Sequence, residues 1–347
     1  MEMLWYGVVS VMLAVYVVLD GFDIGAGTLH LLVARSDSER RTVLGAIGPL
    51  WDGNEVWLLA GGGALVLAFP EAYAVGFSGF YLPLILVLWL LVLRGLSIEL
   101  RSHLRNPLWR SFWDVVFTSA SALLGVVLGA ALGNVIRGVP LDESGTFGLP
   151  LFAEALPGLR SGVLDLYTVL VGVFTLVALA AHGGLFLAWK TEGAVQARSL
   201  RAARLLFVLV GVLLVVVTWA TVRVQPVLAE AASRRPLAWL TLLLVAAGIA
   251  GLVLGLARGR AALAFAGSAL FLVGLLASAA AASWPVLLHS TVSPRFDLTA
   301  QAAASQADAL RTALTWALIG LPLACAYFVY VARTFRGPVR VEPEPEP

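Results

Sequence analysis

Charged residues and cysteines are scarce in this sequence, and each shortage excludes a class of protein. Of 347 residues, 13% are charged and 60% are hydrophobic, whereas about 25% are charged in an ordinary soluble domain. The single cysteine, Cys325, excludes an intramolecular disulfide and a cysteine-based metal cage. The net charge of +2 is small and the basic residues are scattered, which argues against a nucleic-acid partner.

The apolar residues gather in runs near the ~20 residues that span a bilayer, which predicts an all-α, polytopic membrane protein. The start, Met1-Glu2-Met3, lacks the basic residues of a secretory signal, so we expect the first apolar run to be a retained helix. In total we expect nine transmembrane helices, near residues 5–34, 53–70, 75–100, 113–134, 162–189, 203–223, 237–257, 261–283 and 307–333.

The basic residues predict the orientation of these spans. With the N-terminus outside, 15 of the 23 Lys and Arg residues fall on the inner side, seven fall on the outer side and Arg94 lies within the membrane. Because cytoplasmic loops carry an excess of Lys and Arg, we expect an outside N-terminus and an inside C-terminus.

The chain divides by chemistry rather than into soluble domains. We expect residues 1–336 to form a single helical unit, with the charged helices in 1–134, an apolar group in 162–283 and a last helix in 307–333. The tail, 337–347, is acidic and rich in proline and is expected to be disordered. Function is therefore expected in the first half of the chain.

Within that half, two carboxylates lie near the membrane midplane. The first span is centred near Asp20, and Asp23 follows one turn further inward on the same face. A rise of about 1.5 Å per residue places Arg94 of the third span on the inner side of the midplane, within reach of Asp23. We expect Asp23 and Arg94 to pair, because an unpaired charge there costs roughly 2.5 to 3.5 kcal/mol.

Three further acids lie closer to the inner surface. Asp52 and Glu55 are one turn apart at the start of the second span, and Glu99 of the third span lies at a similar level as a further charge partner. Asp52, Glu55, Asp23 and Asp20 form a ladder of titratable groups that suits proton relay from the inner face.

Purely structural interpretations of these residues stay open. The Asp23 and Arg94 pair could fix helix register, and Asp52 and Glu55 could face the positive end of a helix dipole. The four histidines lack metal-ligand spacing and lie near helix ends, which argues against a haem or metal ligand in this chain.

A series of ordered motifs lies within the first 101 residues. The motifs are Leu19-Asp20-Gly21-Phe22-Asp23-Ile24-Gly25-Ala26-Gly27, Gly48-Pro49-Leu50-Trp51-Asp52-Gly53-Asn54-Glu55-Val56-Trp57, Phe69-Pro70, Phe77-Ser78-Gly79-Phe80-Tyr81, and Arg94-Gly95 with Glu99 and Arg101. These motifs closely resemble subunit II of the cytochrome bd-type quinol oxidases. The match is long and ordered over residues 19–101 and looser near the end of the chain.

This resemblance implies two four-helix bundles plus one peripheral helix in the bacterial inner membrane. It also implies a partner, the haem-bearing subunit I, with which such enzymes oxidise quinol and reduce oxygen to water using cytoplasmic protons. By the resemblance, Asp52 is the first candidate for the relay, while Trp57, with Trp51, is a candidate for the subunit interface or the oxygen route. For Trp57, packing at the interface is the alternative to a role in the oxygen route.

The resemblance also sets the expected cofactors and partners. Two b-type haems and one d-type haem are expected in subunit I and none in this chain, while a quinone or lipid could bind here structurally and small single-helix subunits could join. Two rival functions remain: a purely scaffolding subunit of the same complex, and a secondary transporter. A transporter usually shows inverted repeats, and no second copy of the Asp20 to Asp52 pattern is present.

Overall fold

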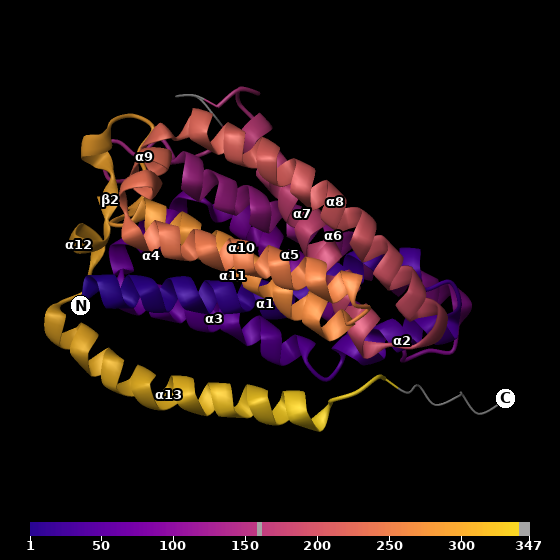
Figure 1. Cartoon of the computed structure of the whole chain (residues 1–347). Helices are drawn as coiled ribbons and strands as arrows, with labels where there is room; N and C mark the ends of the chain where they lie inside the picture. Colours follow the sequence, from indigo (N-terminus) through magenta and orange to yellow (C-terminus); the bar gives the residue numbers. More distant parts are fainter. Residues whose placement is uncertain (158–161, 340–347) are drawn as a thin grey trace.

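The computed structural model describes residues 1–157 and 162–339. Its long helices run side by side along one common direction (Figure 1). The helices are α1 (Glu2–Val33), α2 (Asp37–Ile47), α3 (Trp51–Ala68), α4 (Pro70–Gly79), α5 (Tyr81–Leu100), α6 (Pro107–Arg137), α7 (Leu166–Lys190), α8 (Gly193–Val224), α9 (Pro226–Arg234), α10 (Pro236–Ala257), α11 (Ala261–Ser283), α12 (Ala300–Ala303) and α13 (Ala307–Thr334).

Eight helices in the described part of the chain are long and apolar enough to cross a bilayer: α1, α5, α6, α7, α8, α10, α11 and α13. A helical, multi-pass membrane protein is therefore confirmed. The expected span at 53–70, which is not among these eight, corresponds to α3. The first turns of α3 carry Asp52, Asn54 and Glu55, which lower its mean hydropathy. The count of nine spans stays a prediction.

The basic loops gather at one end of the molecule, as the orientation argument requires. Ion pairs there join helix α2, the end of α5 and the starts of α6 and α8. We call this the inner end, because the Lys and Arg distribution predicts that it faces the cytoplasm. The opposite, outer end carries the N-terminus, α9 and α12 (Figure 1).

Local sequence explains where several helices begin. Ser36 caps α2 and forms a capping box with Glu39, and Asp165 caps α7 in the same way with Thr168. The expected span at 75–100 is two helices instead, α4 and α5, which meet at Phe80. Proline begins α4, α6, α9 and α10, where its missing N–H costs no hydrogen bond.

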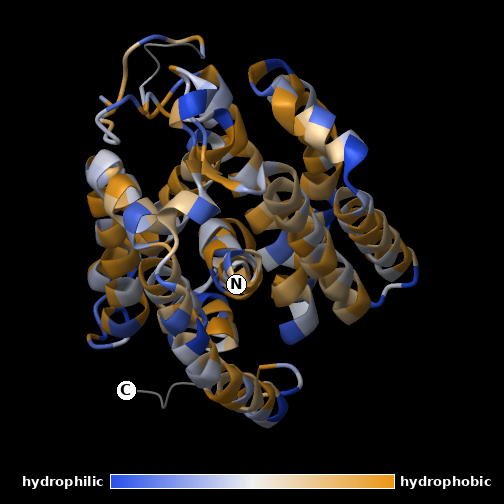
Figure 2. Ribbon diagram, turned by 90° about the vertical axis from the view of Figure 1, so that its left-hand side faces the viewer, coloured by the Kyte–Doolittle hydropathy of each residue, from blue (hydrophilic) through white to orange (hydrophobic). Residues whose placement is uncertain are grey.

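Helix α1 is the central element of the fold. It packs against α3, α6, α7 and α11, and its N-terminus lies in the middle of the end-on view in Figure 2. The α1–α7 crossing depends on glycine: a Cβ on Gly25 would lie 1.9 Å from the carbonyl oxygen of Leu179, and one on Gly183 would lie 2.3 Å from the nitrogen of Ala26. Small residues thus let the two backbones touch.

Helix α13 lies along one side of the molecule and makes little contact with it (Figure 1). Its principal helix neighbour is α3, where the Phe328 ring packs 5.6 Å from the ring of Trp57. This position agrees with the expected peripheral last helix, whereas the division of the other helices into two four-helix bundles stays a prediction.

The all-α expectation missed a small β-element at the outer end. Strands β1 (Val286–Leu288) and β2 (Leu298–Thr299) pair antiparallel within the connection between α11 and α12. With β1 three residues long and β2 two, they carry too little alternating pattern to be recognised from sequence. The connection packs against the outer ends of α1 and α3 through a shared apolar cluster.

Candidate functional site: a buried acidic cluster

One arginine joins three helices in the interior of the first half of the chain. The guanidinium of Arg94 on α5 donates to Asp20 on α1 at 2.6 Å and to Glu55 on α3 at 3.1 Å. Arg94 and Asp20 are fully buried, whereas the Glu55 side chain is 23% exposed. The cluster therefore connects a sealed interior to a position with access from outside the chain.

The structure corrects the expected pairing of Asp23 with Arg94. Asp23 accepts a hydrogen bond from the amide of Asn54 on α3 at 2.8 Å, while Arg94 turns to Asp20 and Glu55. The depth estimate treated Arg94 as a point on its helix axis, whereas its long side chain reaches the level of Asp20. Asn54, which also donates to the carbonyl of Leu19, occupies the place beside Asp23.

The remaining acid of the expected ladder, Asp52, and the expected charge partner Glu99 are both exposed. Asp52 lies in the first turn of α3 at the inner end, one turn before Glu55. Glu99 lies in the last turn of α5 and makes no ion pair with the described residues. The structure thus brings Asp20, Asp23 and Glu55 together, places Asp52 at their entrance and leaves Glu99 outside.

The two tryptophans of the motif flank this cluster. Trp57 is buried among Met12, Tyr16 and Phe328. The ring of Trp51 lies over Gly95 of α5, where an added Cβ would meet it at 3.4 Å. Both contacts are packing contacts within this chain, and the roles in an interface or an oxygen route stay predictions.

Several buried polar atoms around the cluster have no hydrogen-bond partner among the described residues. They are the second carboxylate oxygens of Asp20 and Asp23, the Tyr16 hydroxyl, the Trp57 indole nitrogen and the Arg94 Nε. Tyr16 lies one turn outward of Asp20 on α1. Because buried polar groups ordinarily find a protein or water partner, these atoms retain unused hydrogen-bonding capacity beside the cluster.

Sequence reasoning missed a second buried acid. Asp114 on α6 accepts hydrogen bonds from His30 at 2.7 Å, Arg101 at 2.6 Å and Arg40 at 2.9 Å. Burial lowers the pKa of Arg101, but its bonds to Asp114 and Asp37 outweigh that effect and hold its pKa above the ordinary value. The sequence did contain a signal for this site, because Asp114 is a carboxylate only one residue inside the expected span at 113–134.

Two of the buried histidines have hydrogen-bond partners that hold their rings in place. Both ring nitrogens of His182 are engaged, one with Ser268 at 2.6 Å and the other with the Val18 carbonyl at 3.1 Å. His30 places its Nε2 on Asp114. The absence of a haem from this chain stays a prediction.

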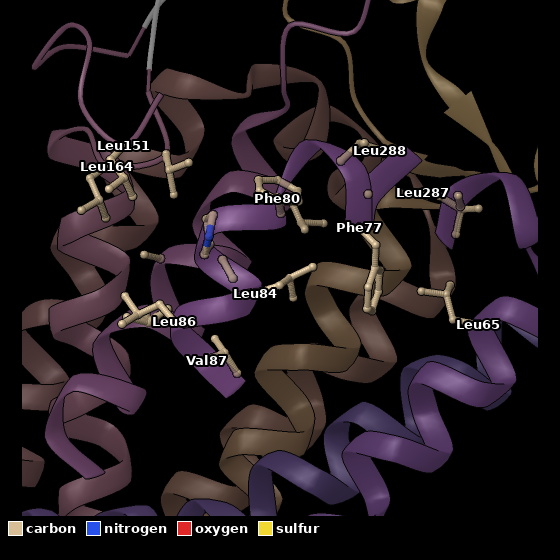
Figure 3. A pocket seen from close by; sticks show the side chains of 18 residues that line it. Leu65, Phe77, Phe80, Leu84, Leu86, Val87, Leu151, Leu164, Leu287 and Leu288 are labelled. Carbon is tan, nitrogen blue, oxygen red and sulfur yellow. The ribbon is translucent and has the colours of Figure 1, made fainter. Parts of the chain in front are cut away.

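An apolar cavity of about 270 Å³ lies towards the outer end, away from the acids. Side chains from α4, α5 and α6 line it together with residues of the outer connections, as Figure 3 shows for Phe77, Phe80, Leu84 and Leu287. All of its lining residues are apolar. The cavity suits a hydrocarbon chain rather than an ion.

Comparison with known proteins gives concordant matches. A family model described as cytochrome bd terminal oxidase subunit II matches residues 1–335. The probable cytochrome oxidase subunit 2 of Haemophilus influenzae is 32% identical over 95% of this chain and 93% of its own length. The cytochrome bd-I ubiquinol oxidase subunit 2 of Escherichia coli is 35% identical over 59% of this chain and 52% of its own length.

The fold has a solved counterpart as well. The structure of bd oxidase from Geobacillus thermodenitrificans contains a chain that superposes with a TM-score of 0.76, covering 96% of this chain and 98% of that one. Sequence identity is 16%, so this likeness concerns the fold alone.

Proposed function

The chain belongs to the cytochrome bd terminal oxidase subunit II family, and on this premise we propose that it pairs with a haem-bearing subunit I in the bacterial inner membrane. In this complex it helps to deliver cytoplasmic protons to the site that reduces oxygen to water. The haems, held by subunit I, would supply the electron transfer and oxygen chemistry. This chain's own residues bind and pass protons.

One observation carries the proposal: an exposed carboxylate at the inner end is followed by carboxylates of increasing burial. Asp52 is exposed, Glu55 is partly exposed one turn further along α3, and Asp20 is fully buried on the other side of Arg94. Acids embedded at membrane depth are functional candidates by default. The order of burial supports proton entry from the inner end towards the interior.

The charge balance of the cluster supports a proton-holding role. Arg94 is the one cation that the described contacts place among Asp20, Asp23 and Glu55. Three ionised carboxylates beside one guanidinium would leave two uncompensated charges in a poorly solvated interior, which is costly. The cluster therefore favours retention of at least one proton, and it can exchange that proton with Asp52 through Glu55.

Beyond Asp20, the unpartnered polar atoms indicate how a proton would continue. The free carboxylate oxygens of Asp20 and Asp23 and the hydroxyl of Tyr16 are buried, and Asp20 interacts electrostatically with both Tyr16 and Asp23. Water bound between them would complete a hydrogen-bonded path from the carboxylates towards the middle of α1. Tyr16 is the member of this path on the outer side of Asp20.

A scaffolding role is the second candidate, because the bond between Arg94 and Asp20 alone would hold α5 against α1. A double replacement of Asp20 and Arg94 by apolar residues separates the two roles. If the complex assembles and keeps its oxidase rate, the buried charges serve assembly only. If it assembles and loses its rate, they serve proton delivery.

We further propose that the outer apolar cavity holds a hydrocarbon chain of a quinone or lipid. A Cβ on Gly76, which lines the cavity, meets no atom within 4 Å, so Gly76→Leu would fill space without a backbone clash. We expect the purified variant to lose a co-extracted quinone or phospholipid that the parent retains. Identical lipid and quinone extracts from the two proteins would contradict the proposal.

The test of the main proposal uses the assembled complex and Asp52→Asn, which keeps the shape of the side chain and removes its titration. We expect a slower oxygen-consumption rate, most strongly at alkaline pH, with the haem content unchanged. Glu71→Gln, an exposed acid in the first turn of α4 at the outer end, is the matched control. A wild-type rate for Asp52→Asn across neutral and alkaline pH would remove Asp52 from the relay.

A further inference from the structure

A groove separate from the outer cavity lies away from the acidic cluster, in the apolar half of the chain. It has a volume of about 260 Å³ and runs between α8 and the α10–α11 pair. Phe207, Gly211 and Leu214 of α8 line one wall, and Leu252 and Phe271 line the other. Since most of α8 is exposed along its apolar length, this groove opens towards the membrane.

The packing of the surrounding helices explains why the groove exists. Helix α10 packs tightly on α11, because a Cβ on Gly255 or Gly267 would lie less than 2.5 Å from the opposite backbone. Helix α8 packs instead on α7 and meets the other pair near Ala203. Beyond that contact, the groove occupies the space between α8 and α10.

The inner mouth of the groove is cationic. Arg204 lines the groove, is exposed and makes no hydrogen bond or ion pair with the described residues. The turn that joins α10 to α11 at the same end carries Arg258 and Arg260, both exposed. Helices α8, α10 and α11 contain no aspartate or glutamate, so no carboxylate on these walls competes for the arginines.

We propose that this groove binds an anionic glycerophospholipid of the inner leaflet, with the phosphate at Arg204 and an acyl chain along Gly211 and Leu214. Basic pockets between transmembrane helices on the cytoplasmic side are suited to such headgroups. The apolar walls accept the chain, and the cationic mouth selects the headgroup charge. The site is independent of the proton relay and stands whether or not that relay is correct.

Two substitutions test the two halves of the site. Arg204→Gln removes the headgroup charge at an exposed position. Gly211→Leu fills the groove, and a Cβ at Gly211 meets no atom within 4 Å, so the helix itself is not disturbed. The controls are Arg223→Gln, the same charge change at the outer end of α8, and Gly320→Leu on α13, where a Cβ also meets nothing within 4 Å.

The membrane complex is incubated with vesicles of equal parts phosphatidylglycerol and phosphatidylcholine, repurified, and its bound lipid is counted by native mass spectrometry. We expect the parent to retain phosphatidylglycerol preferentially. Arg204→Gln should lower this retention about fivefold, the factor for roughly 1 kcal/mol per basic residue. Gly211→Leu should abolish it, and both controls should match the parent.

Any other pattern overturns the proposal. Equal retention of the two lipids by the parent would show an apolar groove without headgroup selection. Parent-level phosphatidylglycerol in either Arg204→Gln or Gly211→Leu would remove the half of the site that the variant probes. An equal loss in Arg223→Gln would show a diffuse charge effect, and an equal loss in Gly320→Leu would show a general effect of adding a side chain.

Discussion

The guanidinium of Arg94 lies 2.6 Å from a carboxylate oxygen of Asp20, and both side chains are fully buried. The same guanidinium reaches Glu55 at 3.1 Å. One side chain therefore ties α5 to α1 and α3, the helices that carry the acidic motifs. The same contacts of Arg94 fix the relative positions of these helices and contribute to the stability of the protein, so a substitution of Arg94 affects both.

Arg94→Met should destabilise the protein by about 3 to 5 kcal/mol, because it leaves the Asp20 carboxylate buried without its cation. Thermal unfolding of the detergent-solubilised complex measures this loss. Arg333→Met, an exposed arginine near the end of α13, is the control. Unfolding of the Arg94 variant at the parent temperature would contradict a structural ion pair.

Adding Asp20→Leu to Arg94→Met should recover part of the lost stability, since the double variant no longer buries an unpaired charge at this position. The double-mutant cycle measures the coupling between the two residues. Simple additivity of the two single effects would show that the 2.6 Å contact contributes no coupling.

Gly25→Ala should prevent close packing of α1 on α7, because its Cβ would overlap the Leu179 carbonyl at 1.9 Å. The required backbone shift should cost about 3 kcal/mol or more and lower the yield of assembled complex. Gly62→Ala is the matched control: its Cβ meets nothing within 4 Å, and alanine favours the helix by about 1 kcal/mol. Equal yields for the two variants would contradict the close crossing.

Asp114→Asn should loosen the inner end of the molecule. The substitution removes the carboxylate that Arg40 and Arg101 share and leaves Arg101 buried. We expect a loss of about 3 kcal/mol and faster hydrogen exchange in α2, whose Arg40 would be released. Asp142→Asn, in an exposed outer loop, is the control. Unchanged exchange in α2 would show that Asp114 does not hold this helix.

Glu39 should make stability depend on pH at acid values. Burial raises its pKa, but the N–H groups of Arg35 and Ser36 and the guanidinium of Arg198 outweigh this and hold the pKa below its ordinary value. A group with a depressed folded-state pKa stabilises the protein above its unfolded pKa, and this contribution is lost as the pH falls through the folded value.

The comparison of Glu39→Gln with the parent protein checks this sign. The variant should unfold at a lower temperature than the parent at neutral pH, and the difference should vanish as the pH falls below the folded pKa of Glu39. Glu143→Gln, in an exposed outer loop, should show no such convergence. A difference that is constant with pH would exclude the contribution of Glu39.

Much of this fold could be predicted because bilayer-length apolar runs are explicit in a sequence. Eight of the expected spans appear as long apolar helices, and the basic loops gather at one end. The short helices α2 and α9 and the pair β1–β2 could not be foreseen, since a few residues of weak pattern carry too little periodicity. The break at Phe80 within an expected continuous span was missed for the same reason.

The acidic cluster was predicted in its membership but not in its contacts. Helical rise placed Asp20, Asp23, Glu55 and Arg94 within one region, and Arg94 joins two of the acids, Asp20 and Glu55. Arg94 pairs with Asp20 rather than with Asp23 because of the reach of its side chain and because Asn54 binds Asp23. Neither feature can be derived from the depth of each residue along its helix. Asp114 was missed because its partners come from α1, α2 and the end of α5, which only tertiary packing brings together.

Proton uptake by the assembled complex in sealed vesicles tests the central proposal most directly, with a pH dye reporting on the cytoplasmic face during oxygen reduction. For Asp52→Asn we expect uptake slowed by about tenfold or more at neutral and alkaline pH, with Glu71→Gln at the parent rate. Uptake by Asp52→Asn at the parent rate from that face would show that protons reach the oxygen-reducing site by another route.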